Sequence, residues 1–65
     1  MKVNRVNYNI DWSKFKVGWS FFLPCLQAEE GKQEILGVTN RFGFEVAIKV
    51  VIENGIRGLR IWRIR

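Results

Sequence analysis

Residues 44–65 read FEVAIKVVIENGIRGLRIWRIR, and they carry the clearest structural signal in the chain. Apolar side chains occupy every second position of residues 44–53, which predicts a β-strand with one apolar face. Asn54-Gly55 follows, and both residue types tolerate the positive φ angles of a tight hairpin turn. The pattern therefore predicts a β-hairpin whose return strand covers residues 56–65.

A two-residue loop fixes which residues of the two strands lie opposite each other. The expected cross-strand pairs are Val50–Leu59 and Ile48–Ile61 on the core face, and Lys49–Arg60 and Ala47–Trp62 on the opposite face. A register shift of one residue would exchange the two faces of the return strand. Both orientations of Trp62 therefore stay open from the sequence. Gly58, inside the return strand, is typical of a β-bulge.

The middle of the chain, residues 28–42, predicts one α-helix with its apolar side chains near one face. Glu29 and Glu30 lie near its start and Arg41 near its end, which suits the helix dipole. Gly43 is well placed to end the helix. Gly31 weakens the first turn, so a start after Gly31 is an alternative to a start at residue 28.

Preceding this helix, residues 19–23 (WSFFL) are rich in aromatic side chains and predict a short strand ending at Pro24. Residues 2–10 alternate less regularly, and residues 12–16 suggest a short helical turn. The order of elements is then β-β-α-β-β, or β-α-β-β if the N-terminus is irregular. We predict a single α+β domain, residues 1–65, with one helix packed on a small antiparallel sheet.

Composition limits how this domain is stabilised and where it works. The 65 residues contain one cysteine and no histidine, which excludes an intrachain disulfide and a Cys/His zinc site. Three Trp and five Phe must supply much of the core, unless a dimer completes it. The lone thiol, the lack of a signal peptide and the shortness of the apolar stretch 19–26 predict a soluble cytoplasmic protein, in the host cytoplasm if the source is viral.

Four aromatic residues, Trp12, Trp19, Phe21 and Phe22, have two interpretations. They form a core wall, or they form an exposed patch for a partner protein. A chain of this length has few residues with which to build a core, which favours the core for most of the four. Adjacent Phe21 and Phe22 point to opposite faces of a strand, so one of them can lie at an interface.

The net charge of +5 is unevenly distributed, because the last nine residues hold four arginines and no acidic residue. Guanidinium groups match phosphate oxygens, and an indole ring among them offers a stacking surface for a base. The expected nucleic-acid contacts are Lys49, Arg57, Arg60, Trp62, Arg63 and Arg65. A buried Trp62 with solvated arginines around it is an equally weighted alternative. Glu29, Glu30 and Glu34 are interpreted as a solvated helix face and not as a cation site.

Three segments carry a resemblance: VGWSFFLP at residues 17–24, RFGF at 41–44 and GLRIWRI at 58–64. They resemble a group of very short bacteriophage proteins with a VGxSFFxP-like segment, a helix closing on RxGF and a final strand reading RVWRI. The resemblance covers residues 10–65, and Trp19 departs from it. It implies an accessory protein acting inside the host cell, and it brings no catalytic residue to this chain.

Catalysis is not expected, because the chain has no histidine, no phosphate-binding glycine loop and no partner for Cys25 as a nucleophile. No cofactor or metal is expected either. The leading hypothesis is a small phage-type protein that binds DNA or RNA. The alternative is an inhibitor or adaptor that binds a host enzyme or defence complex. A third hypothesis is a homodimer formed by pairing of the C-terminal strand as a sheet edge.

Overall fold

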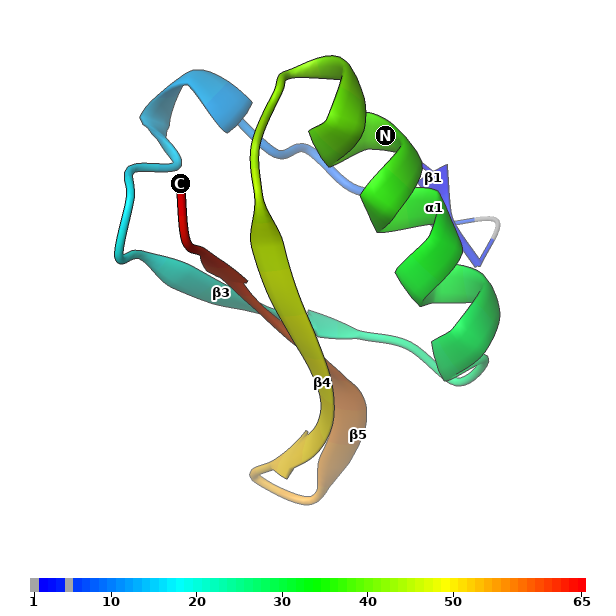
Figure 1. Cartoon of the computed structure of the whole chain (residues 1–65). Coiled ribbons are helices and arrows are strands. Elements are labelled where there is room, and N and C mark those ends of the chain that lie inside the picture. The colour runs from blue at the N-terminus through cyan, green and yellow to red at the C-terminus, as the bar shows by residue number, and fades with distance from the viewer. Residues whose placement is uncertain (1, 5) are drawn as a thin grey trace.

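The computed structural model of the protein describes residues 2–4 and 6–65 and shows an α+β fold (Figure 1). Two very short strands come first, β1 (Lys2–Val3) and β2 (Val6–Asn7), followed by a single 3-10 turn, η1 (Trp12–Lys14). The remaining elements are β3 (Ser20–Pro24), α1 (Ala28–Arg41), β4 (Val46–Glu53) and β5 (Ile56–Arg63).

The main sheet has three antiparallel strands in the order β3-β5-β4. The C-terminal strand β5 is therefore central, and the prediction that it forms a sheet edge is wrong. It lies in the middle because it pairs with β4 through the hairpin and with β3 through a long-range contact. The strands β1 and β2 pair only with each other within the described residues, so the N-terminal strand prediction holds for two short pieces outside the main sheet.

The predicted hairpin is confirmed in turn and register. Asn54 and Gly55 have φ angles of 53° and 76°, the two positive values of a type I′ turn. The four predicted cross-strand pairs all occur. The predicted bulge at Gly58 is wrong, because the ladder runs through Gly58 with Pro24 and Val51 as its partners. What this position requires is the absence of a side chain, since a Cβ there would meet the Phe22 ring at 2.8 Å.

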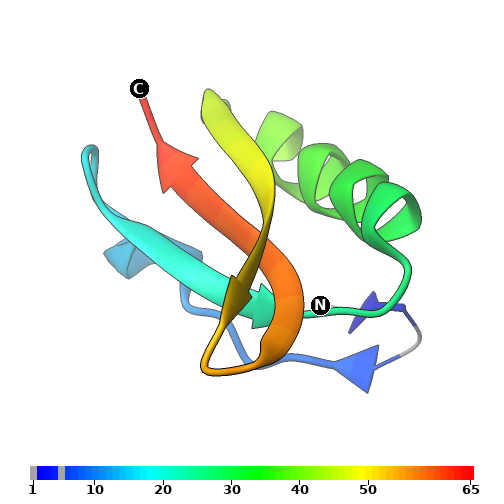
Figure 2. The same cartoon turned by 90° about the horizontal axis from the view of Figure 1, so that it is seen from below.

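The helix α1 begins at Ala28, the earlier of the two predicted starts, and ends before Gly43, whose φ is 74°. Its buried face consists of Gly31, Ile35 and Thr39. Thr39 satisfies its buried hydroxyl by donating a hydrogen bond to the Ile35 carbonyl oxygen at 3.1 Å. This face covers one side of the sheet, which we call the inner face; Figure 2 shows α1 on that side.

The core lies between the inner face and α1, and its centre is formed by Leu23, Ile35, Leu59 and Ile61, each at most 3% exposed. An aromatic group extends the core toward η1, because Trp12, Phe15 and Phe21 meet edge to face at centroid distances of 5.1–5.8 Å. The core interpretation is thus confirmed for Trp12 and Phe21. It is wrong for Trp19, which is 57% exposed in the turn before β3.

Among the described residues, no helix combines the length and the apolar character needed to cross a membrane.

Candidate functional site on the outer face of the sheet

The face of the sheet turned away from α1, here called the outer face, carries every second residue of the three strands. The ladder places these residues in rows across the strands. One row is Phe22, Arg60 and Lys49, and the next is Ser20, Trp62 and Ala47. Trp62 therefore lies on the outer face, as the two-residue turn predicts, and the alternative in which it turns into the core is wrong.

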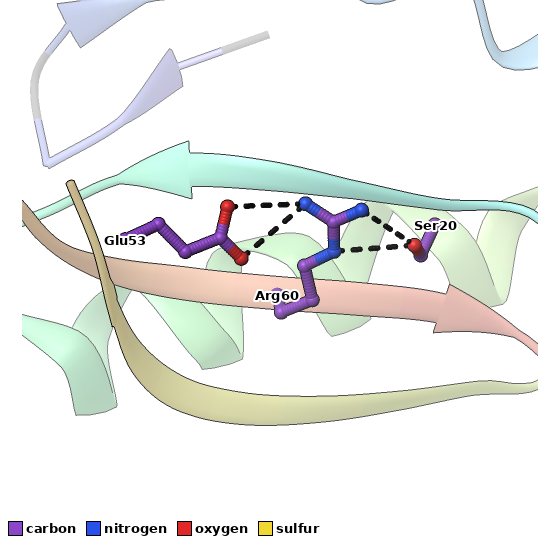
Figure 3. Close-up of polar contacts among 3 residues, drawn as sticks. All are labelled: Ser20, Glu53 and Arg60. Atoms are coloured by element: carbon purple, nitrogen blue, oxygen red, sulfur yellow. Dashed lines mark hydrogen bonds and ion pairs between the residues drawn. The ribbon is translucent and has the colours of Figure 1, made fainter.

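Arg60 lies at the centre of the outer face, and its guanidinium is held at both ends (Figure 3). Its Nη2 and Nε donate to the Ser20 hydroxyl oxygen at 2.9 and 3.1 Å. Its Nη1 donates to the Glu53 carboxylate at 3.3 Å. The side chain stays 30% exposed, so an outer edge of the guanidinium still faces solvent. Strands β3 and β4 thus fix the orientation of a cation that β5 supplies.

The hairpin curves away from α1 toward its turn (Figure 2), and Glu53 at this end contacts Arg60. Glu53 pairs with Ile56, four positions along β5 from Arg60, and four residues of a flat strand span about 13 Å. Both side chains are long, and they meet along the outer face because Arg60 extends toward the hairpin turn. Gly58 lies at this bend, where a Cβ would overlap the Leu23 carbonyl oxygen. At this bend the Phe22 ring lies against the backbone of Gly58.

Two aromatic rings and two cations share this surface. Phe22 and Trp62 are both half-buried, so each leaves part of its ring accessible. Lys49 is exposed on β4, and no ion pair holds it within the described part of the chain. The arrangement offers apolar ring surface for stacking together with one mobile and one fixed positive charge.

The six residues predicted to contact nucleic acid do not form one patch. Only Lys49, Arg60 and Trp62 come together. Arg57 and Arg63 alternate with Arg60 along β5 and therefore project on the inner side, at opposite ends of the strand. Arg65 lies beyond β5 and pairs with Glu45 at 3.6 Å.

Arg63 packs against the edge of the aromatic core. Its Cζ lies 3.7 Å from the centroid of the Phe44 ring, and its Nη1 donates to the Phe15 carbonyl oxygen at 2.6 Å. Its Nε donates to the Arg65 carbonyl oxygen at 3.0 Å. A guanidinium with these partners is a structural cation, and the contacts within the fold reduce its availability to a phosphate.

A pocket of about 740 Å³ lies between the hairpin turn and the start of α1. Arg57 and Leu26 border it, together with Cys25 and Tyr8. The Cys25 thiol is buried and donates to the Gln27 carbonyl oxygen at 3.3 Å. Burial raises the pKa of this thiol, which keeps it neutral and opposes the thiolate that a nucleophile requires.

The acidic residues of α1 do not converge. Glu34 accepts a hydrogen bond from the Asn4 backbone N–H at 3.2 Å, which ties the N-terminal strands to the helix. Within residues 2–4 and 6–65, no three Asp, Glu, Cys or His side chains are grouped closely enough to hold a metal ion.

No family model, curated protein or solved structure matches the chain. The resemblance to short bacteriophage proteins therefore stays a prediction.

Three members of the outer face were not among the predicted nucleic-acid contacts: Ser20, Phe22 and Glu53. For Ser20 and Phe22 a partial signal exists, because alternation sets them on the face opposite Phe21. Which face β3 turns toward α1 depends on its pairing with β5, a contact between segments 40 residues apart that local pattern does not encode. Glu53 reaches Arg60 diagonally along the hairpin, a contact that the cross-strand register alone does not give.

Proposed function

We propose that the protein binds single-stranded DNA or RNA on the outer face of its sheet. One observation carries this proposal: the ladder gathers Trp62, Arg60 and Lys49, with Phe22 beside them, on the face that α1 leaves uncovered. Open sheet faces that combine aromatic and basic side chains suit unpaired bases, because every base has a ring face that can stack. On this proposal the protein works in the cytoplasm, that of the host cell if it is a phage protein.

Each side chain has a separate role. Trp62 and Phe22 stack with bases, while Lys49 attracts the phosphate backbone as a point charge. Arg60 presents a guanidinium whose orientation is already fixed by Ser20, so less side-chain freedom is lost on binding. A phosphate competes with Glu53 for the exposed edge of that guanidinium, which makes Arg60 a weaker contact than a free arginine.

The shape of the outer face favours a single strand over a duplex. Three strands at 4.8 Å spacing make a surface only about 10 Å across between the two outer strands. Stacking on Trp62 also requires a base that has left its own stack, which a duplex does not offer without a cost.

Fluorescence anisotropy with labelled DNA and RNA oligonucleotides of about 12 nucleotides tests the proposal, since this length fits the site sizes of small sheet platforms. Trp62→Leu should weaken binding by about tenfold or more, the value expected for losing one stacked base. Trp19→Leu is the matched control, because Trp19 is exposed outside the outer face. Equal losses in the two variants would remove the outer face as the site.

The charge contribution is tested by a second matched pair. Lys49→Ala and Lys14→Ala remove the same charge, but only Lys49 lies on the outer face. Loss of one phosphate contact should lower the slope of log affinity against log salt by about 0.7 for a single strand. We expect this change for Lys49→Ala and little change for Lys14→Ala. The same slope in both variants would indicate attraction by net charge alone.

The second candidate function is that of an adaptor or inhibitor that binds a host protein. The observation that favours it is exposed apolar surface at the end of the hairpin and beside α1, where Ile52 is 71% and Leu26 88% exposed. Pull-down from a host lysate treated with nuclease separates the two functions. Capture of one protein that survives the treatment, together with no measurable oligonucleotide binding, favours the adaptor.

A further inference from the structure

The strand β4 has a strand neighbour on only one side in the part of the chain that the structure describes. Its eight residues, Val46–Glu53, therefore present a free edge. Such an edge exposes backbone N–H and C=O groups that can pair with another strand. The question is which strand fits it.

The ladder identifies the backbone groups that face this edge. Ile64 donates its N–H to the Glu45 carbonyl oxygen at 2.8 Å, whereas Arg63 donates to Trp19 on the other side at 3.0 Å. Backbone bonding in an antiparallel pair alternates from residue to residue. The odd-numbered residues of β4 thus bond to β5, and the even-numbered ones direct their N–H and C=O groups outward. In the second half of β4 these are Val50 and Ile52.

The second half of the edge is also where apolar side chains are uncovered. Val46 and Ile48 lie half-buried beneath α1. Val50 and Ile52 continue the same inner-face row beyond the helix, and they are 52% and 71% exposed. Backbone groups that lack a strand and apolar side chains that lack a cover thus coincide over the same few residues.

The charges of β4 fit a second copy of β4 in one antiparallel register. Centring a two-fold axis on Val51 places Val50 opposite Ile52 of the second copy, and Lys49 opposite its Glu53. Both Lys49–Glu53 pairs are attractive, and opposite charges directly across a strand pair are stabilising. A register centred on Lys49 would oppose like charges. A lysine on an edge strand ordinarily discourages pairing, but here it meets a carboxylate.

We propose that two copies of the chain pair through the second half of β4 and form a continuous six-stranded antiparallel sheet. Val50 and Ile52 form the hydrogen-bonded cross-strand pairs of this interface, and Val51 meets its own copy at the two-fold axis. The contact is self-complementary, as a two-fold interface must be. A strand pair alone lies at the small end of interface sizes, so the dimer is reversible and depends on concentration.

Sedimentation equilibrium over a range of concentrations tests this interface through charge reversal. Lys49→Glu and Glu53→Lys each place like charges opposite one another, so each variant alone should dissociate at least tenfold more readily than the unmodified chain. Mixed together, the two variants restore both attractive pairs, and the mixture should associate again. Circular dichroism checks that both variants are folded. An unmodified chain that stays monomeric, or a mixture no tighter than its components, overturns the proposal.

A cysteine cross-link tests the register. In a Cys25→Ser background, Val51→Cys sets two thiols at the axis in a non-hydrogen-bonded pair, where Cα atoms lie about 4.5 Å apart and a disulfide fits. Ala47→Cys is the control on the same face, because its copy lies about 26 Å away in this register. Oxidised glutathione should link Val51→Cys and leave Ala47→Cys as single chains. Equal linkage of both variants overturns the register.

Lys49 belongs to both this interface and the nucleic-acid site, but Ile52 belongs to the interface alone and can separate the two. Ile52→Glu changes only the inner side of β4, so it should abolish the dimer and leave affinity per chain for a short oligonucleotide within about twofold. A loss of oligonucleotide binding in this variant would contradict the independence of the two surfaces. Unchanged sedimentation would contradict the dimer.

Discussion

The same three strands form both faces of the sheet, but other elements cover only the inner face. On the inner face, α1 and the segment around η1 cover Ile61 and its neighbours, and Arg63 closes the aromatic group through Phe44. On the outer face, no second layer is present within the described residues, and Arg60 is held only by side chains of the sheet itself. Alternate residues of β5 thus face a covering layer on one side and an uncovered sheet surface on the other.

The largest expected effect comes from opening the inner face. Ile61→Ala removes a fully buried side chain and should lower the free energy of unfolding by about 3 kcal/mol. A chain of 65 residues has roughly 3–10 kcal/mol in total, so this variant will be close to unfolded. Urea denaturation measures the change. Lys49→Ala on the outer face should change the free energy of unfolding by less than about 0.5 kcal/mol. Similar losses in the two variants would contradict the difference in stability contribution between the inner and outer faces.

The next largest effect is expected at Gly58, where β5 passes close to Leu23 and Phe22 of β3. Gly58→Ala places a Cβ against the Leu23 carbonyl oxygen and 2.8 Å from the Phe22 ring, and the backbone atom cannot move aside cheaply. We expect the free energy of unfolding, measured by thermal or urea denaturation, to fall by about 2 kcal/mol. Gly37→Ala is the control, because nothing lies within 4 Å of its Cβ position on α1. The free energy of unfolding of Gly37→Ala should rise by up to about 1 kcal/mol.

Gly58 also shows what the sequence could and could not predict. The hairpin was predictable because alternation and the Asn54-Gly55 turn are local signals that agree. The helix was predictable for the same reason, through its period and Gly43. The sequence could not show that Gly58 meets Phe22, because that contact joins two strands separated by α1. The same long-range pairing sets β5 in the centre of the sheet.

The candidate site was predicted in part. Lys49, Arg60 and Trp62 follow from the hairpin register alone. Arg57 and Arg63 were grouped with them because they are close in sequence, although a period of two sends them to the other face. The partners of Arg63 are Phe15, which follows η1, and Phe44, which precedes β4, so its structural role depends on tertiary packing that no local pattern reveals.

A smaller effect should separate the two arginines of β5. Arg63→Met loses a charged hydrogen bond to the Phe15 carbonyl oxygen and the contact with Phe44, at a cost of about 1–2 kcal/mol. Arg60→Met loses a partly exposed ion pair with Glu53 and the hydrogen bonds to the Ser20 hydroxyl, which we expect to be worth about 1 kcal/mol together. Oligonucleotide affinity should show the reverse order, with the larger loss for Arg60→Met. The same rank in both measurements would show that the faces are not divided between stability and binding.

The smallest expected effect is a pH dependence of stability that arises from the buried Cys25 thiol. Burial raises the pKa of the folded thiol above its value near 9 in the unfolded chain. Below that pH both states hold the proton, and stability from this group is constant. Above it the unfolded chain releases the proton first, so the free energy of unfolding falls as pH rises. Cys25→Ala lacks this decline, and parallel curves for the two proteins between pH 8 and pH 10.5 would mean that solvent reaches the thiol.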